Sequence, residues 1–169
     1  MKNVLLVIDV QNDYFANGKL PLWNTDATLE NIVRAVKRAR DKDVQVVLVQ
    51  HLSDPKDSPM FNEGTTGAEI HPRLRAAVPD APVVTKQFAD SFYKTDMERV
   101  LAELGATHLL VCGMMTQNCV THTAISKSAE KYDVTILPDC CTTVSALIHA
   151  IALRAVATRL PLVPSEQAI

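Results

Sequence analysis

Three side chains with complementary chemistry each follow a short apolar run in this sequence: Asp9, Lys86 and Cys119. If these runs are parallel strands of one sheet, the three residues meet beyond the carboxyl ends of the strands, where ligands bind in open parallel sheets. A thiol, a carboxylate and an ammonium group held together can perform nucleophilic catalysis. Taken singly, each residue also has an ordinary structural interpretation, as a helix cap, a solvated lysine or a packed cysteine.

Cys119 is the candidate nucleophile. We expect Thr116 to be the N-cap of a helix that runs toward Tyr132, so that Cys119 lies in its first turn, where the helix dipole favours a thiolate. A nearby Lys86 would lower the pKa of the thiol further, and Asp9 could accept the thiol proton and return it to a leaving group. Backbone N–H groups of the same turn could stabilise the oxyanion that forms when the thiolate attacks a carbonyl carbon.

The elements that must position these residues alternate between strands and helices. Short β-branched runs predict strands at residues 4–8, 44–49, 82–85, 108–112 and 134–137. Apolar residues at helical spacing mark three helices, through Leu29, Ile32, Val33 and Val36, through Met97, Val100, Leu101 and Leu104, and through Val144, Leu147, Ile148, Ile151 and Ala155. This alternation predicts an α/β fold, with a mainly parallel sheet covered on both faces.

Local signals mark one helix and one long connection. Thr95-Asp96-Met97-Glu98 fits a capping box that opens the second helix, and Gly105 is expected to end it. Residues 53–79 contain four prolines and two glycines with little periodicity. Such a connection is typical of a binding loop or lid, and a surface excursion with a short helix fits it equally.

The composition predicts one soluble domain. The 169 residues include 17 Lys and Arg and 19 Asp and Glu, and 47% are hydrophobic. Neither sign of charge is concentrated, which argues against a nucleic-acid partner. No apolar run approaches the roughly 20 residues that cross a bilayer, so no membrane contact is expected. The four cysteines need no disulfide in a domain of this size, which favours reduced thiols in a cytoplasm.

Two kinds of cofactor site are not expected. The five glycines form no G-x-G-x-x-G after the first strand, so no nicotinamide dinucleotide site is predicted. Cys140 and Cys141, taken with His108 and His122, lack the C-x₂-C spacing of a zinc site, and packing in the core explains them more simply.

Three motifs resemble those of the isochorismatase-like cysteine hydrolase superfamily, which includes nicotinamidases. Asp9-Val10-Gln11-Asn12-Asp13-Tyr14-Phe15 is similar to the first-strand signature D-x-Q-N-D-[FY]. Lys86-Gln87-Phe88-Ala89-Asp90-Ser91-Phe92 resembles the lysine segment, and Gly113-Met114-Met115-Thr116-Gln117-Asn118-Cys119-Val120 resembles the nucleophile turn G-x-x-T-x-x-C-V. The motifs occur in family order, and the similarity extends over essentially the whole chain.

The resemblance implies a fold and a mechanism. The fold would be a Rossmann-like three-layer α/β/α sandwich formed by a single domain, residues 1–169. The triad would be Asp9, Lys86 and Cys119, and a thioester-type intermediate would be hydrolysed by water. The resemblance also implies a non-proline cis peptide at Met114-Met115, with the N–H groups of Met115 and Cys119 as the oxyanion hole.

The chain departs from the nicotinamidase pattern after the second strand. Nicotinamidases hold a metal there through an Asp-x-His pair with further histidines, whereas this sequence has His51 and Ser53 at the matching positions. No metal or other cofactor is therefore expected. Isochorismatases that cleave a vinyl ether commonly lack the nucleophilic cysteine, so the presence of Cys119 favours an amide-type C–N bond in a small-molecule substrate.

Several residues are candidates for the substrate pocket. Phe15, Phe61, Phe88 and Phe92 could line it, and His51 could orient the substrate. Core packing explains the phenylalanines as well, and a histidine satisfied at a strand end explains His51. His71, in the long connection, could touch substrate or cap a turn.

A metal-independent amidase is the leading interpretation. An isochorismatase-type or nicotinamidase-type hydrolase and a non-catalytic, thiol-reactive binding protein are the alternatives. The family commonly forms dimers or tetramers, and the apolar helix at residues 144–156 could supply an interface as well as core, so a homodimer or homotetramer is expected.

Overall fold

A five-stranded, entirely parallel sheet forms the centre of the protein. The computed structural model describes residues 2–169. The strands lie in the order β3-β2-β1-β4-β5, which makes β1 the central one. They span Asn3–Ile8 (β1), Gln45–His51 (β2), Val83–Lys86 (β3), His108–Met114 (β4) and Asp133–Thr142 (β5). All five predicted strands are present: β1, β2, β4 and β5 are longer than predicted, and β3 is shifted by one residue.

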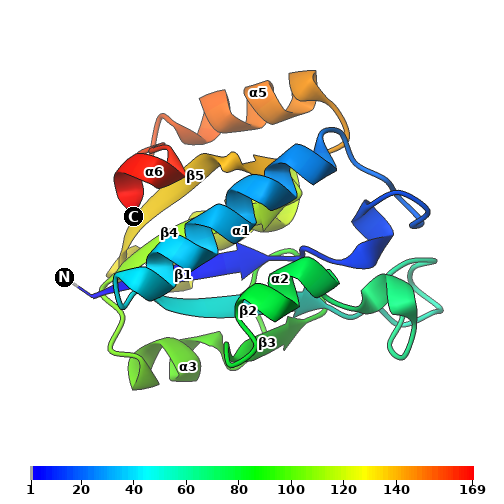
Figure 1. The fold of residues 1–169 in the computed structure, drawn as a ribbon, viewed down its shortest axis with the longest axis horizontal. Helices are drawn as coiled ribbons and strands as arrows, with labels where there is room; N and C mark the ends of the chain where they lie inside the picture. Colours follow the sequence, from blue (N-terminus) through cyan, green and yellow to red (C-terminus); the bar gives the residue numbers. More distant parts are fainter. Residues whose placement is uncertain (1) are drawn as a thin grey trace.

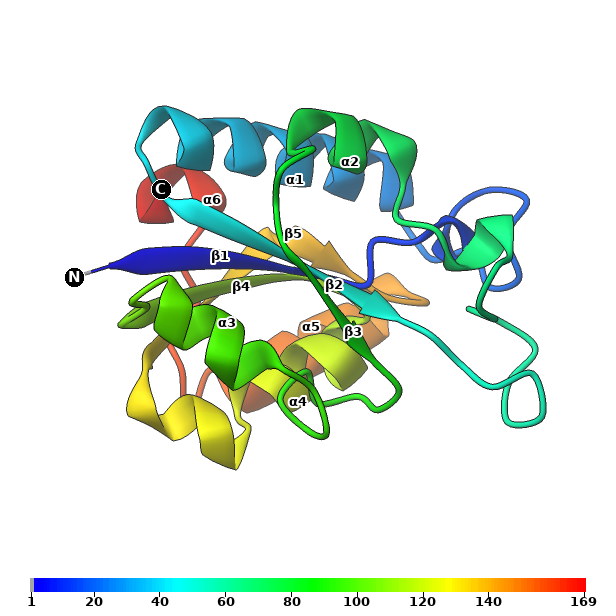
Figure 2. The same cartoon turned by 90° about the horizontal axis from the view of Figure 1, so that it is seen from below.

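Helices cover both faces of the sheet, which confirms the predicted three-layer α/β/α fold. In Figure 2, α1, α2 and α6 lie on one side of the sheet, and α3, α4 and α5 lie on the other. Figure 1 shows the first of these faces, with α1 crossing the sheet. The helices span Thr25–Asp41 (α1), Pro72–Ala77 (α2), Met97–Glu103 (α3), Thr121–Ala124 (α4), Ala146–Val156 (α5) and Ser165–Ala168 (α6).

Both faces of β1 are buried, which explains its continuous apolar sequence. Its residues from Val4 to Ile8 are at most 1% exposed. A strand with helices on both sides buries every side chain, whereas a half-exposed strand alternates. The predicted apolar face of α1, represented by Leu29, Ile32 and Val36, packs onto this core. Full burial of each such side chain contributes about 1.5–3 kcal/mol before entropic costs.

The third helix begins and ends close to the predicted residues, but its cap differs. The Thr95 hydroxyl accepts a hydrogen bond from the Met97 N–H at 3.2 Å and donates to the Ser91 carbonyl, while Asp96 occupies the N-cap position. The predicted capping box, in which Thr95 would accept from Glu98, is therefore wrong. Gly105 follows the helix with a φ of +66°, a left-handed conformation that suits the glycine expected there.

The single helix predicted from Thr116 toward Tyr132 is wrong. The segment breaks into a π-helical turn, Thr116–Val120 (η3), the one-turn α4, and a 3₁₀ helix, Lys127–Lys131 (η4). Thr116 does not act as the N-cap, because its hydroxyl bonds to Nδ1 of His149 at 2.8 Å. Ser126 instead starts the last piece by accepting from the Ser128 N–H.

The predicted apolar stripe of α5 faces solvent and does not contribute to the core. Leu147 is 70% exposed and Ile151 is 59% exposed, and Val144 and Ile148 are also exposed. The helix buries a different face, with Ala152 and Val156. The elements that α5 contacts are η3 and β5, while Leu147 and Ile151 remain exposed.

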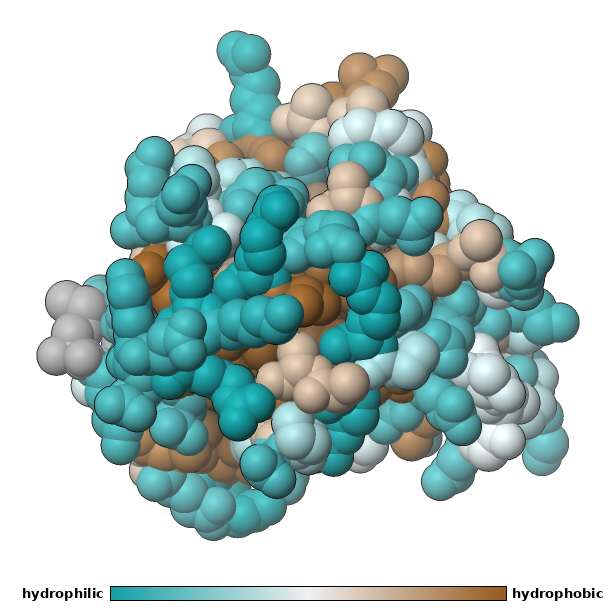
Figure 3. Space-filling view, in the orientation of Figure 1, coloured by the Kyte–Doolittle hydropathy of each residue, from teal (hydrophilic) through white to brown (hydrophobic). Residues whose placement is uncertain are grey.

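The surface is polar where α1 and α2 cover the sheet. The face covered by α1 and α2 is mainly hydrophilic in Figure 3, and hydrophobic side chains come into view along the upper edge, where Figure 1 shows α5. None of the helices within residues 2–169 is long and apolar enough to span a membrane.

Gly113 allows β4 to lie close to β1 just before the nucleophile turn. Its φ is +123°, and a Cβ atom built there would lie 2.0 Å from the Ile8 carbonyl oxygen. Both the backbone conformation and the missing space therefore require glycine.

We expect Gly113→Ala to lower the free energy of unfolding by about 3 kcal/mol or more, because it adds backbone strain to a steric clash. Gly64→Ala is the matched control, since Gly64 has a φ of +78° with nothing within 4 Å of the added Cβ; it should cost about 1 kcal/mol. Urea unfolding of the two variants measures the difference. Equal losses of stability would show that the contact with Ile8 is not tight.

Candidate active site

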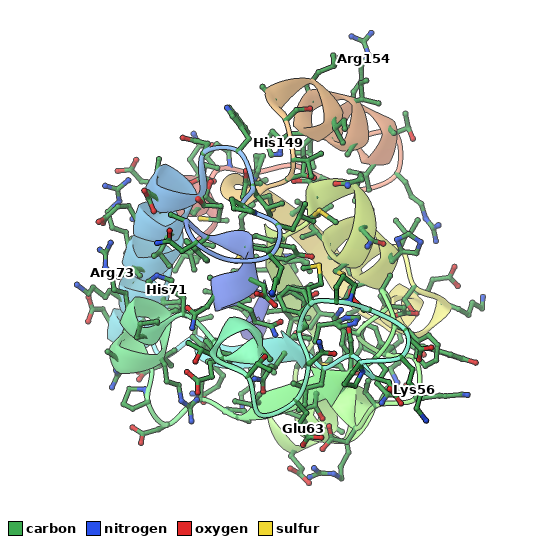
Figure 4. All side chains as sticks on the ribbon, turned by 90° about the vertical axis from the view of Figure 1, so that its right-hand side faces the viewer. Lys56, Glu63, His71, Arg73, His149 and Arg154 are labelled. Atoms are coloured by element: carbon green, nitrogen blue, oxygen red, sulfur yellow. The ribbon has the colours of Figure 1, made fainter. Side chains whose placement is uncertain are left out.

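The parallel register brings the predicted catalytic residues to one edge of the sheet. Asp9 comes directly after Ile8 of β1, and its N–H donates to the Val49 carbonyl of β2. Lys86 ends β3 and pairs in register with His51, the last residue of β2. Cys119 lies in the η3 turn that follows β4. Figure 4 looks onto this side of the molecule, where the loop with Lys56 and Glu63 crosses in front of the strands.

The Lys86 ammonium group lies at the centre of the site. Its Nζ atom is 2.8 Å from Oδ2 of Asp9, 3.2 Å from Sγ of Cys119 and 3.0 Å from Nδ1 of His51. It also donates to the Phe88 carbonyl at 3.0 Å. The side chains of the Asp9–Lys86 ion pair are 0% exposed, so the pair is shielded from solvent. Oδ1 of Asp9 is buried with no hydrogen-bond partner among residues 2–169.

These four contacts exceed the capacity of the ammonium group. Lysine has three N–H donors, so one of the four acceptors must go without a hydrogen bond at any moment. A neutral thiol sulfur is the weakest acceptor of the set. The sulfur is therefore the acceptor that goes without a hydrogen bond in the resting protein, and the ammonium group can donate to it once it becomes a thiolate.

The electrostatics favour a neutral thiol in the resting protein. Burial and the Asp9 carboxylate raise the pKa of Cys119, and the opposing effect of Lys86 is smaller. Burial lowers the pKa of Lys86, but Asp9 and Cys119 raise it by more, so the lysine stays charged. The predicted resting thiolate is thus wrong: Cys119 lies in a π-helical turn, with a buried carboxylate beside it.

The nucleophile turn has an unusual backbone that is held by α5. The Met114–Met115 peptide bond is cis, at the position that the resemblance implies. The Met115 carbonyl accepts from the N–H groups of Asn118 and Val120, which closes the turn. Thr116 is fastened to His149 of α5, as described above, and Figure 4 shows His149 at the start of that helix.

Gln11 is a positioning residue that the sequence analysis missed. It is fully buried, and its amide binds both backbone groups of His51: Nε2 donates to the His51 carbonyl, and Oε1 accepts from the His51 N–H, each at 2.8 Å. Nε2 also donates to the Ala68 carbonyl at 2.8 Å. The first motif contains this glutamine, so the signal was present in the sequence, but its partners lie about 40 and 57 residues away.

Asp13, from the same motif, was missed as well. Its carboxylate is 4% exposed and accepts from the N–H groups of Lys19 and Phe61, at 3.2 and 2.7 Å. A Cβ atom at Gly67 would lie 2.2 Å from this carboxylate. Asp13 therefore joins the start of the chain to the long connection, and Gly67 leaves the space for it.

Comparisons with known proteins agree with this architecture. The model of the isochorismatase domain family matches residues 3–166. The chain belongs to the isochorismatase family. It is 35% identical over 149 residues to the uncharacterized isochorismatase family protein YddQ of Bacillus subtilis, covering 88% of this chain and 82% of that protein. It is also 29% identical to Nicotinamidase 3 of Arabidopsis thaliana, over 88% and 77% of the two chains.

A solved structure supports the same assignment. A proposed isochorismatase hydrolase from Oleispira antarctica superposes with a TM-score of 0.88 at 31% identity, covering 99% of this chain and 95% of the other. This isochorismatase-family protein is therefore a hydrolase with the α/β sandwich of its relatives.

The four phenylalanines that were predicted to line the substrate pocket lie in different surroundings. The Phe61 ring centroid is 5.7 Å from that of His51 and 4.8 Å from that of Tyr14. Phe88 reaches the site through its carbonyl, while the residue is 44% exposed and its ring packs on Tyr93. Phe15 and Phe92 are buried.

Phe15 and Phe92 pack on other aromatic rings, and their place in the substrate pocket stays a prediction. The Phe15 ring lies 4.4 Å from the His71 ring, and the Phe92 ring stacks on Tyr132 at 6.4 Å. His71 also accepts from the Arg73 N–H at 3.3 Å as the N-cap of α2, which agrees with its expected role in a turn. Lys86 also lines a cavity of about 220 Å³, together with Leu52, Glu63, Thr85, Gln87, Phe88 and Lys94.

One group of side chains in the described residues has the donor atoms that a metal ion could use. Among the described residues, Asp9, His51 and Cys119 offer donor atoms within 4.8 Å of one another. The Lys86 ammonium group is within 3.2 Å of all three, so these donors already surround one cation. A second positive charge would meet the first at close range, and the residues present do not suit a metal. The absence of a metal stays a prediction.

The other three cysteines lie in the surroundings of packed core residues. Cys112, Cys140 and Cys141 are at most 3% exposed and unpaired. The Cys141 thiol donates to the Leu137 carbonyl at 3.3 Å, and Cys140 lies 3.7 Å from the Asp139 carboxylate. Burial raises the pKa of each of these three thiols.

Replacement of Asp9 should make the Cys119 thiol of this enzyme more acidic. Because the carboxylate raises the pKa of the thiol, Asp9→Asn lowers that pKa and enlarges the thiolate fraction at a given pH. Iodoacetamide reacts with the thiolate. At a pH below the pKa of the thiol, each unit by which that pKa falls therefore raises the rate of alkylation about tenfold. We expect the wild type to react slowly at pH 7 and Asp9→Asn to react faster.

The rate is measured by mass spectrometry of the peptide that contains Cys119, between pH 6 and 10. Cys112 lies in β4 and is fully buried, so its alkylation reports unfolding and serves as the internal control. A rate at neutral pH that Asp9→Asn leaves unchanged would contradict the effect of Asp9 on the thiol.

Proposed function

We propose that this hydrolase cleaves an amide-type C–N bond of a small molecule through a covalent thioester on Cys119. The observation that carries the proposal is the contact of one buried ammonium group, on Lys86, with both the Asp9 carboxylate and the Cys119 sulfur. The kinship with Nicotinamidase 3, whose name describes an amide substrate, supports the choice of bond. Neither a metal nor another cofactor enters the reaction.

The first half of the reaction forms the thioester. Asp9 takes the proton of the Cys119 thiol, and the sulfur attacks the carbonyl carbon, so that a C–S bond forms and the carbonyl π electrons move to oxygen. The Lys86 ammonium group stabilises the thiolate as it forms. The N–H groups of Met115 and Cys119 would hold the oxyanion. When the C–N bond breaks, the leaving amine takes the proton from Asp9.

The second half releases the acid. Asp9, again a carboxylate, takes a proton from a water molecule as that water attacks the thioester carbon. The C–S bond breaks, and the sulfur recovers the proton to become a neutral thiol. A high thiol pKa fits this cycle, because the proton is shared between Asp9 and Cys119 and returns to sulfur at the end.

Other activities remain as alternatives within the same fold. An isochorismatase-type reaction on an ether would not need Cys119, and a nicotinamidase of the metal-dependent kind would need the ligands that His51 and Ser53 replace. A thiol-reactive binding protein would keep the buried triad without turnover.

We also propose a cytoplasmic location for the enzyme, since its four cysteines are unpaired thiols.

We also propose that the chain forms a homodimer or homotetramer through α5. The exposed Leu147 and Ile151 project from this helix, and a groove of about 350 Å³ lies beside its other half, with Ala152, Ala155 and Val156 in its wall. If two α5 helices cross antiparallel at Ile151, Leu147 of one chain meets Ala155 of the partner subunit. A large residue then faces a small one twice, as two-fold symmetry requires.

Loss of Cys119 should abolish turnover. Cys119→Ala removes the nucleophile, and we expect ammonia release from a panel of small primary amides, nicotinamide included, to fall to background while the urea midpoint changes little. The assay is run with and without a chelator, which should make no difference. Release that survives the substitution would contradict the covalent mechanism, and release that a chelator stops would contradict the metal-free one.

A charge on the exposed face of α5 should weaken self-association. Ile151→Glu places a carboxylate where an apolar contact is proposed, and we expect sedimentation velocity to show a shift from oligomer to monomer. Lys37→Glu is the control, because Lys37 is exposed on α1, which lies on the opposite face of the sheet from α5. A wild type that sediments as a monomer would overturn the proposal.

A further inference from the structure

His51 is fixed more firmly than a residue without a function in the site would require. Its N–H and carbonyl groups are both bound by the fully buried Gln11, as described above. Its ring is held by Lys86 at Nδ1 and packs against Phe61. Such multiple fixing is typical of side chains that must present one atom to a ligand.

Lys86 determines which nitrogen of His51 carries the proton. The ammonium group is a donor only, so the Nδ1 atom 3.0 Å away must be the acceptor. Burial and the charge of Lys86 lower the pKa of His51, so the ring is neutral near pH 7 and its single proton is on Nε2. His51 can therefore neither accept a proton from the nucleophile at Nε2 nor act as a general base at Nδ1. The only function left to it is hydrogen-bond donation from Nε2.

The Nε2–H group is available for that purpose. Among residues 2–169, the only hydrogen bond of the His51 ring is the one at Nδ1, and the side chain is half-buried. A ring nitrogen of His51 lies within 4.8 Å of the Cys119 sulfur. Because both nitrogens belong to the same small ring, a substrate whose carbonyl carbon is at the sulfur lies beside the imidazole, and its second acceptor atom is proposed to meet Nε2.

The charges nearby select a neutral acceptor. Asp9 neutralises Lys86 in the ion pair, so no net positive charge is left for an anion. A second buried carboxylate, Asp13, is bound to the N–H of Phe61, whose ring packs on His51. An anionic group at this position would be desolvated next to these carboxylates, which is costly.

We propose that His51 donates from Nε2 to a second, uncharged hydrogen-bond acceptor of the substrate, such as a ring nitrogen or a carbonyl oxygen. The proposal rests on the proposed function, because it places this acceptor relative to the carbonyl that Cys119 attacks. It defines the substrate as a neutral small amide with an acceptor beside the scissile group, and it makes His51 a specificity-determining residue.

Reversible aldehyde binding tests the contact without turnover. The Cys119 thiol adds to an aldehyde: a C–S bond forms, the π bond breaks, and the thiol proton ends on the former carbonyl oxygen. The probes are the 2-, 3- and 4-pyridinecarboxaldehydes, which carry a ring nitrogen, and benzaldehyde, which does not. Dissociation constants for wild type and variants are obtained by calorimetry, with Cys119→Ala to establish that the thiol is the site.

His51→Phe removes the donor and keeps an aromatic ring. For at least one pyridinecarboxaldehyde we expect the dissociation constant to rise about tenfold, the effect of one hydrogen bond of ordinary net strength, while benzaldehyde changes by less than about twofold. His51→Gln, which restores an N–H donor, should recover part of the loss. For each aldehyde, the dissociation constant of the variant is divided by that of the wild type, so differences in intrinsic reactivity among the aldehydes cancel.

His108→Phe is the matched control. His108 is also half-buried, but it starts β4 at the opposite edge of the sheet, where its Nε2 is 2.9 Å from the Thr135 hydroxyl. This variant should leave all four aldehydes unchanged. Equal effects of His51→Phe on all four aldehydes, or no Cys119-dependent binding of any of them, would overturn the proposal. Failure of amide hydrolysis alone would overturn the proposed function, since aldehyde addition requires no leaving group.

Discussion

The buried ion pair between Lys86 and Asp9 is the interaction on which the site depends. Removing two charges from water is expensive, and a pair of this kind persists only where good geometry and further hydrogen bonds compensate the cost. Here the compensation comes from the Phe88 carbonyl and the His51 ring, which accept the other two N–H groups of Lys86. The chain therefore spends folding free energy to keep one positive charge beside a sulfur atom, and the three strands β1, β2 and β3 must keep their register for this charge to remain paired.

The part of the site that could be predicted from the sequence is the set of reactive side chains at the ends of the strands. Asp9 and Lys86 follow apolar runs directly, and the parallel-sheet rule places such residues together without any knowledge of side-chain contacts. The state of Cys119 could not be predicted in this way. Its pKa depends on burial and on a carboxylate 110 positions earlier in the sequence, and the turn that holds it is π-helical, which no periodicity indicates.

The errors in the fold have a common origin. The apolar stripe of α5 has the spacing of a core-facing helix, but spacing does not reveal which face meets the protein, and the buried face, with Ala152 and Val156, was not part of the predicted stripe. Thr116 has a typical capping side chain, yet its hydroxyl bonds to His149 instead. In both cases a tertiary contact overrides a local preference, and the contact joins segments that are about 30 residues apart.

The residues that follow β1 attach most of the long connection to the sheet. Gln11 and Asp13 bind the backbone at Ala68 and Phe61, the Asn12 N–H donates to the Glu69 carbonyl, and the His71 N–H donates to the Val10 carbonyl. Residues 61–71 are thus a fixed wall of the site, while residues 54–59 make only local turns outside it. A change of length between residues 54 and 59 could therefore alter the rim of the site and leave its interior intact, which gives the fold a position where new substrate preferences can be acquired without rebuilding the catalytic residues.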